Sequence, residues 1–238
     1  MNCKTCPIDN YYWNEVYSNK TIQTDILRMY YHHEFFPSCL NPSLKLCAPT
    51  PLEVSNLLLE LIYSYNISEI IAILKCNFNP YIIEAKDIPQ FSNFDDCFYN
   101  VVQNIIRSGY SSVNYDQMGF FLRNAPRNIV ADRKYGENHA KTAALMGLCV
   151  IKRGVGISVT PIGEAFSQLS REKQNNLKAK LCLYIPLMQN VFAQEYTQEI
   201  IDSSLGVLSP TTRKRRHPNI KYIQMLIQDS IDNELYRH

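Results

Sequence analysis

The stretch that decides the fold runs from Asp132 to Gly163. It begins with Asp132-Arg-Lys-Tyr-Gly-Glu-Asn-His-Ala-Lys-Thr-Ala-Ala-Leu-Met-Gly-Leu148 and continues with Cys149-Val-Ile-Lys-Arg-Gly154. After a short turn it closes with Ile157-Ser-Val-Thr-Pro-Ile-Gly163. Helical spacing in the first part and short apolar runs in the others predict a helix, a strand, a basic turn, a second strand and the start of another helix.

The helix in this stretch is predicted from Glu137 to about Gly147. At about 100° per residue, three alanines and Leu148 share one face, and their small size allows close packing. The opposite face is polar and basic, which suits a helix that enters the major groove of DNA. We therefore expect four side chains to face base edges: Asn138, His139, Lys141 and Thr142.

A basic turn and a new helix complete the pattern. Lys152 and Arg153 lie between the two strands, so we expect them at the tip of a hairpin, where they would meet phosphate or a minor groove. Thr160 suits the cap of the next helix, with Pro161 at its first position.

Two further helices are predicted before the quoted stretch. One covers residues 94–107 with Asn93 as its cap, and the other covers residues 115–123 with Asn114 as its cap. The result is the order of a helix-turn-helix followed by a hairpin wing. The link over residues 124–136 is predicted to be a loop, and it carries cations that could reach a groove or the DNA backbone: Arg127, Arg133 and Lys134.

The densest charge cluster lies near the C-terminus. A tail helix is predicted after Pro210, with Thr211 or Thr212 as its cap. Four cations at the positive end of a helix dipole are unfavourable without an anion, and a phosphate backbone would relieve that cost. We therefore expect phosphate contact by Arg213, Lys214, Arg215 and Arg216.

These motifs together resemble the winged-helix modules attached to type II restriction endonucleases and related defence proteins. The resemblance is carried by residues 133–148, by Val159-Thr-Pro-Ile-Gly163, and by Ser209-Pro-Thr-Thr-Arg-Lys-Arg-Arg216 before Ile220-Lys-Tyr-Ile-Gln-Met-Leu226. It covers about residues 90–230. It implies sequence-specific binding of double-stranded DNA in a restriction-modification or regulatory context, and it leaves open whether the chain has its own nuclease.

The chain is predicted to be mainly α-helical, with one small β-hairpin and three regions. Residues 1–88 form an N-terminal helical region, with a helix from about Thr21 or Thr24 to His33 and two helices over 52–75 that are broken near Asn66. Residues 89–170 form the winged helix-turn-helix domain. Residues 171–238 form a helical extension, with two helices separated by Pro186 before the tail helix.

The first four of the eight cysteines predict a structural zinc site. Tetrahedral zinc is often held by a pair of cysteines two residues apart, and a segment rich in proline and aromatic residues would gain stability from a metal cross-link. We expect the ligands Cys3, Cys6, Cys39 and Cys47, with a variant in which His33 replaces Cys47. The other four are expected in the core: Cys76, Cys97, Cys149 and Cys182.

One short segment raises an alternative function. Tyr81-Ile-Ile-Glu-Ala-Lys-Asp87 could be a strand that ends in the Glu-x-Lys half of a magnesium-dependent nuclease signature, with Glu84 on the metal and Lys86 on the attacking water. No Pro-Asp pair exists to supply the second carboxylate, so Glu60 or Glu69 would have to serve from helical segments. A nuclease would need a sheet here, where the pattern predicts helices.

Composition is compatible with DNA binding and indicates no membrane span. The net charge is +2, but the charges are unevenly distributed. Residues 1–100 contain 6 Lys/Arg and 11 Asp/Glu, and residues 101–238 contain 18 Lys/Arg and 11 Asp/Glu. A basic half is a common footprint of phosphate contact. No long apolar run or N-terminal signal is evident, so we expect a cytoplasmic protein. A homodimer and a winged helix that docks a protein partner remain alternatives.

Overall fold

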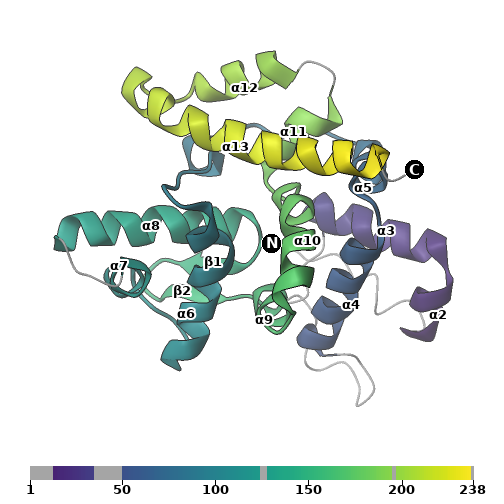
Figure 1. Ribbon diagram of the computed structural model, residues 1–238, viewed down its shortest axis with the longest axis horizontal. Helices are drawn as coiled ribbons and strands as arrows, with labels where there is room; N and C mark the ends of the chain where they lie inside the picture. Colours follow the sequence, from purple (N-terminus) through teal and green to yellow (C-terminus); the bar gives the residue numbers. More distant parts are fainter. Residues whose placement is uncertain (1–12, 35–49, 124–127, 195–196, 237–238) are drawn as a thin grey trace.

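The computed structural model describes residues 13–34, 50–123, 128–194 and 197–236, and it is mainly helical with one small antiparallel sheet (Figure 1). The elements of the first half are α2 (Trp13–Ser18), α3 (Lys20–Tyr31), α4 (Pro51–Ser64), α5 (Ile67–Lys75), the turns η2 (Ala85–Asp87) and η3 (Asp96–Asn100), α6 (Val101–Ser108) and α7 (Tyr115–Arg123). Then follow α8 (Ile129–Leu145), β1 (Cys149–Lys152), β2 (Gly156–Val159), α9 (Pro161–Ser167), α10 (Arg171–Cys182), α11 (Pro186–Ala193), α12 (Thr197–Leu205) and α13 (Pro210–Leu235). The predicted fold class is confirmed at this level.

Local signals placed several helix ends correctly. Thr50 caps α4 in a reciprocal pair with Glu53, and Pro51 occupies the first helical position. The break near Asn66 is present, and the axes of α4 and α5 turn by 108° there. Thr160 caps α9 by accepting a hydrogen bond from Gly163 N at 3.0 Å. In each case the cap satisfies a backbone amide that the helix itself leaves without a partner.

One large hydrophobic core joins the two ends of the chain. Buried side chains of α3, α4 and α5 pack with those of α9 to α13, so the N-terminal helices and the C-terminal extension share an interior. Figure 1 places α3 and α4 on one side of α10, and α8 with the hairpin on the other. Cys97 and Cys182 are buried in this core as expected, whereas Cys76 is exposed, which corrects the prediction for that residue.

A second, smaller core lies between α6, α7, α8 and the hairpin. Ala140 and Ala143 face it, as the sequence predicts, together with Met118 and Cys149. β1 and β2 pair antiparallel, with Cys149 opposite Val159 at the base. The link before α7 adds a β-bridge between Val113 and Ile157. The local order is therefore helix, bridge, helix, helix, strand, turn and strand.

Four boundaries differ from the prediction. α3 runs from Lys20 to Tyr31 and is capped by Asn19, so it begins and ends earlier than expected. α8 begins at Ile129, where Asn128 caps it, so residues 129–136 are helical rather than loop. The C-terminal extension has three helices between residues 171 and 205 in its described part, not two. Ser209 caps α13 by accepting from Thr212 N, in place of either threonine.

Two glycines fix how α7 and α8 cross. A Cβ on Gly119 would overlap the carbonyl oxygen of Asp132, and a Cβ on Gly136 would overlap the carbonyl oxygen of Tyr115 and the amide of Gly119. Any larger residue would push the two helices apart. Gly136, the last residue of the segment predicted to be a loop, is therefore a packing contact inside a helix.

No single helix in the described ranges has the length and apolar character needed to cross a membrane.

The helix crossing gives the first testable prediction. In an exposed helix a change from glycine to alanine raises stability by about 1 kcal/mol. Gly136→Ala should instead lower the free energy of unfolding by about 2–3 kcal/mol, because the new methyl group overpacks the contact with α7. Urea denaturation followed by circular dichroism measures the difference.

Gly154→Ala is the matched control. Gly154 lies in the hairpin turn at φ +78°, and the described residues leave open space around it, so alanine should cost only about 1 kcal/mol of backbone strain. A neutral or stabilising effect of Gly136→Ala would contradict the close approach of the two helices.

Candidate nucleic-acid interface

The outer face of α8 carries a row of charged side chains. Arg133, Lys134 and Lys141 are exposed, and Glu137 and Asn138 are partly exposed between them. These residues lie on the side of the helix opposite the buried alanines, as helical geometry requires. The structure therefore brings together four of the predicted site residues of this helix on one surface.

The charges on this face are paired in the free protein. Glu137 accepts from Lys134 at 2.8 Å and from Lys141 at 2.5 Å, and Arg133 lies 3.4 Å from Asp116 of α7. Burial alone would raise the pKa of Glu137, but hydrogen bonds from the two lysines hold it below its usual value. Glu137 was missed as a site residue, although its spacing of three and four residues from the lysines was visible in the sequence.

His139 and Thr142 do not lie on this face, which corrects their predicted role in base contact. Both are buried. Thr142 Oγ1 donates to Gln90 O at 3.1 Å and accepts from Gln90 N at 3.2 Å. His139 Nε2 accepts from the amides of Ser92 and Asn93 at 3.4 Å, while Nδ1 lies 2.7 Å from Tyr135 O. Their polar atoms hold the backbone of residues 90–93, which we call the strap.

α13 holds the strap from the other side. The side chain of Asn219 donates to Phe91 O at 2.8 Å and accepts from Phe91 N at 3.4 Å. Arg216 donates through Nε to the side chain of Gln90 at 3.1 Å, and through Nη1 to Ala85 O at 2.5 Å and Ile88 O at 3.1 Å. The expected phosphate contact of Arg216 is therefore corrected, because its guanidinium is occupied by the protein itself.

The rest of the basic cluster is open to solvent. Arg213, Lys214 and Arg215 are exposed in the first turns of α13, and within the described ranges no hydrogen bond or ion pair engages their side chains. Gln90 contacts both Thr142 and Arg216, so the strap ties this end of α13 to α8.

The hairpin presents the two predicted wing cations. Lys152 and Arg153 are exposed at its turn, next to Val155, whose side chain is 59% exposed. Gly156 adopts φ +118°, and a Cβ there would press on Val113 O, so a glycine is needed where the bridge meets the sheet.

A partly buried polar network packs beneath α8. Arg123 of α7 lies 2.8 Å from the carboxylate of Asp132 and packs over the ring of Tyr135 at 4.3 Å. The Tyr135 hydroxyl donates at 2.5 Å to Asp96, in the π-helical turn that precedes α6. This network was not predicted, because Asp96 lies 39 positions before Tyr135 and no local pattern connects them.

The predicted metal sites gain no support. The described residues do not include the four predicted zinc ligands: Cys3, Cys6, Cys39 and Cys47. They also leave out Arg127, which was predicted as a DNA contact. Glu84 and Lys86 form an exposed ion pair at 2.8 Å at the turn η2, and the described chain forms no strand there, although the nuclease alternative would require one. No group of three or more metal-ligating side chains gathers among the described residues.

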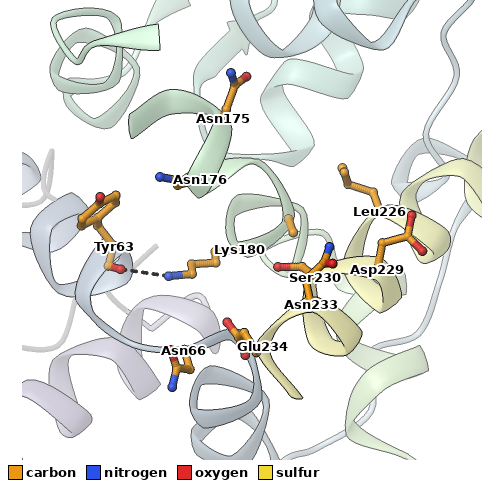
Figure 2. A pocket seen from close by; sticks show the side chains of 11 residues that line it. Tyr63, Asn66, Asn175, Asn176, Lys180, Leu226, Asp229, Ser230, Asn233 and Glu234 are labelled. Carbon is orange, nitrogen blue, oxygen red and sulfur yellow. Dashed lines mark hydrogen bonds between the residues drawn. The ribbon is translucent and has the colours of Figure 1, made fainter. Parts of the chain in front are cut away.

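A polar hollow of about 600 Å³ lies between α4, α5, α10 and α13 (Figure 2). Lys180 donates to Tyr63 O at 2.9 Å and Tyr65 O at 2.5 Å, at the C-terminal end of α4. Glu234 accepts from Ile67 N at 2.7 Å, at the start of α5. The two charges complement the dipole ends of the bent helix pair, so Lys180 and Glu234 have a structural role in this hollow.

Comparisons with protein-family models, curated proteins and solved structures found no match to this chain.

The strap predicts a pH-dependent stability. Burial lowers the pKa of His139 below the usual value for histidine, about 6.5. The unfolded chain therefore binds a proton more readily than the folded protein, so the free energy of unfolding is full above about pH 6.5 and falls as the pH decreases below it. His139→Gln retains an acceptor for the strap but does not titrate. It should reduce this fall between about pH 7.5 and about pH 5.5, as measured by urea denaturation at several pH values.

His217→Gln is the control, because His217 is partly exposed on α13 and lies outside the strap contacts. A His139→Gln protein with the pH dependence of the wild type would show that the strap does not depend on neutral His139.

Proposed function

We propose that residues 94–159 form a winged helix-turn-helix that binds double-stranded DNA, with α8 as the helix that enters the major groove. The observation that carries the proposal is the element order of this region, closed by the Val113–Ile157 bridge, with the cations of α8 on its outward face. In such folds one helix meets base edges while the strands and their turn meet the backbone.

Phosphate contacts would come from two places outside α8. Lys152 and Arg153 at the hairpin turn form one, and the exposed cations Arg213, Lys214 and Arg215 form the other. The strap ties the start of α13 to α8, so the second group has a fixed position relative to the helix. Because the helix start is already held in place, binding a duplex there needs no ordering of the backbone, and only the side chains lose freedom.

Base contacts would come from the outward face of α8. Asn138 and Lys141 suit adenine and guanine edges respectively, and Arg133 and Lys134 can reach either a guanine or a phosphate. Val130 is 75% exposed in the first turn and could meet a thymine methyl group. Arg127 is a further candidate outside the described residues.

The biological setting proposed is sequence-specific binding in a restriction-modification, defence or regulatory context, as the resemblance implies. Cleavage by the chain itself is not favoured, because Glu84 and Lys86 pair with each other on an irregular segment.

A protein-binding role is the second candidate, and one observation favours it. Ile129 is 80% exposed and Phe120 is 59% exposed, so apolar surface is available near the start of α8. Association that persists at high salt would favour this role, since phosphate-driven binding weakens steeply with salt.

DNA binding is tested with fluorescence anisotropy on duplexes of mixed sequence. Two double variants, Lys152→Gln with Arg153→Gln and Arg213→Gln with Arg215→Gln, should weaken binding on all sequences and reduce the salt slope by about 2 each. Lys141→Ala and Asn138→Ala should weaken binding to a selected sequence more than binding to bulk DNA.

Lys20→Gln with Lys75→Gln is the matched control, because these exposed cations lie on α3 and at the end of α5, away from α8 and the hairpin (Figure 1). Equal losses from the control and the test variants would point to net charge alone. Absence of binding by the wild type at low salt would refute the proposed function.

A further inference from the structure

We propose that Glu137 determines sequence specificity by accepting a hydrogen bond from the N4 amino group of a cytosine, with Lys134 and Lys141 placed on guanines or phosphates beside it. The inference rests on the proposed function, since it assigns a residue of the same surface.

Position is the first argument. Glu137 lies near the middle of α8, on the outward face and between two exposed lysines. The other acidic residue of the helix, Asp132, is buried and pairs with Arg123. Glu137 is thus the carboxylate of α8 that a duplex against this face would meet.

Hydrogen-bonding chemistry is the second argument. A carboxylate is an acceptor only, so it can pair only with amino groups on base edges. In the major groove the amino groups belong to cytosine and adenine, while guanine and thymine present the acceptors O6, N7 and O4. Glutamate is suited to cytosine, whereas adenine is matched by a side chain that both donates and accepts. A lone acceptor in the groove therefore selects cytosine and rejects thymine.

The two lysines reduce the electrostatic repulsion between Glu137 and the DNA phosphates. A carboxylate that enters the groove meets the negative field of the phosphates, which opposes binding. Nζ atoms at 2.8 and 2.5 Å neutralise it, and the group of three side chains carries a net charge of +1. Each lysine retains further donors that can reach guanine O6 and N7. The expected target is a cytosine with neighbouring guanines.

A helix-stabilising role is the competing explanation. Exposed ion pairs at spacings of three and four residues add a few tenths of a kcal/mol to a helix, whatever the helix binds. That role makes no prediction about base preference. The two explanations are therefore separated by the sequence that the protein selects.

The experiment selects preferred duplexes from a random library with the wild type, Glu137→Gln and Glu137→Ala. The wild type should enrich a cytosine at one position by about 10-fold over thymine. Glu137→Gln should shift the preference at that position to adenine, because glutamine can donate to N7 and accept from N6. Glu137→Ala should lose the preference there and retain it elsewhere. Loss of folding cannot produce a new preference, so the glutamine result stands on its own.

The outcomes separate the two proposals. If all three proteins enrich the same sequence, DNA binding stands and Glu137 only stabilises the helix. If the wild type binds duplexes with no base preference, the specificity assignment is overturned while phosphate contact stands. If the wild type binds no DNA, both proposals fail.

Discussion

The strap is the constraint on which the arrangement of this protein depends. Residues 90–93 are irregular, yet six of their backbone groups are paired with side chains: Gln90 N and O with Thr142, Phe91 N and O with Asn219, and the amides of Ser92 and Asn93 with His139. Leaving one such buried group without a partner costs about 1–3 kcal/mol. Because the partners come from α8 and α13, the strap joins the smaller core to the larger one and sets the position of the basic cluster.

Signals that act within one turn were predictable from the sequence. Thr50 and Glu53 are three residues apart, and Thr160 and Gly163 are too, so the caps of α4 and α9 could be identified without knowledge of the fold. The alternation and turn of the hairpin are equally local. The fold class and the positions of most helices follow from such signals.

Contacts between distant segments could not be predicted in the same way. Thr142 and His139 are polar residues in a helical pattern, and such residues normally face water. Their partners lie 46 to 52 positions away along the chain, where no periodicity points to them. The role of Gly136 was equally hidden. Glycine is common in loops, but here it lies inside a helix where α8 crosses α7. The smaller core was predicted through its alanines, whereas the buried residues His139 and Thr142 were wrongly assigned to base contact.

In the candidate interface, too, the sequence identifies the kind of residue but not the contacts that it makes. Its cations were identified from composition, but their engagement depends on tertiary contacts. Arg216 donates hydrogen bonds to Ala85, Ile88 and Gln90, which lie up to 131 positions away.

The other three cations of the cluster remain exposed to solvent. At the start of a helix the dipole disfavours positive charge, and here no anionic side chain of the described chain offsets it. Arg216 fixes the helix start through neutral carbonyl groups, so Arg213, Lys214 and Arg215 stay uncompensated and in a defined position. On α8, by contrast, the lysines are compensated by Glu137. A polyanion therefore gains most at the start of α13, while the face of α8 offers less net charge and more distinction between donors and acceptors. In the proposed DNA complex, the start of α13 would therefore contribute mainly to affinity, and α8 would contribute mainly to the recognition of base sequence.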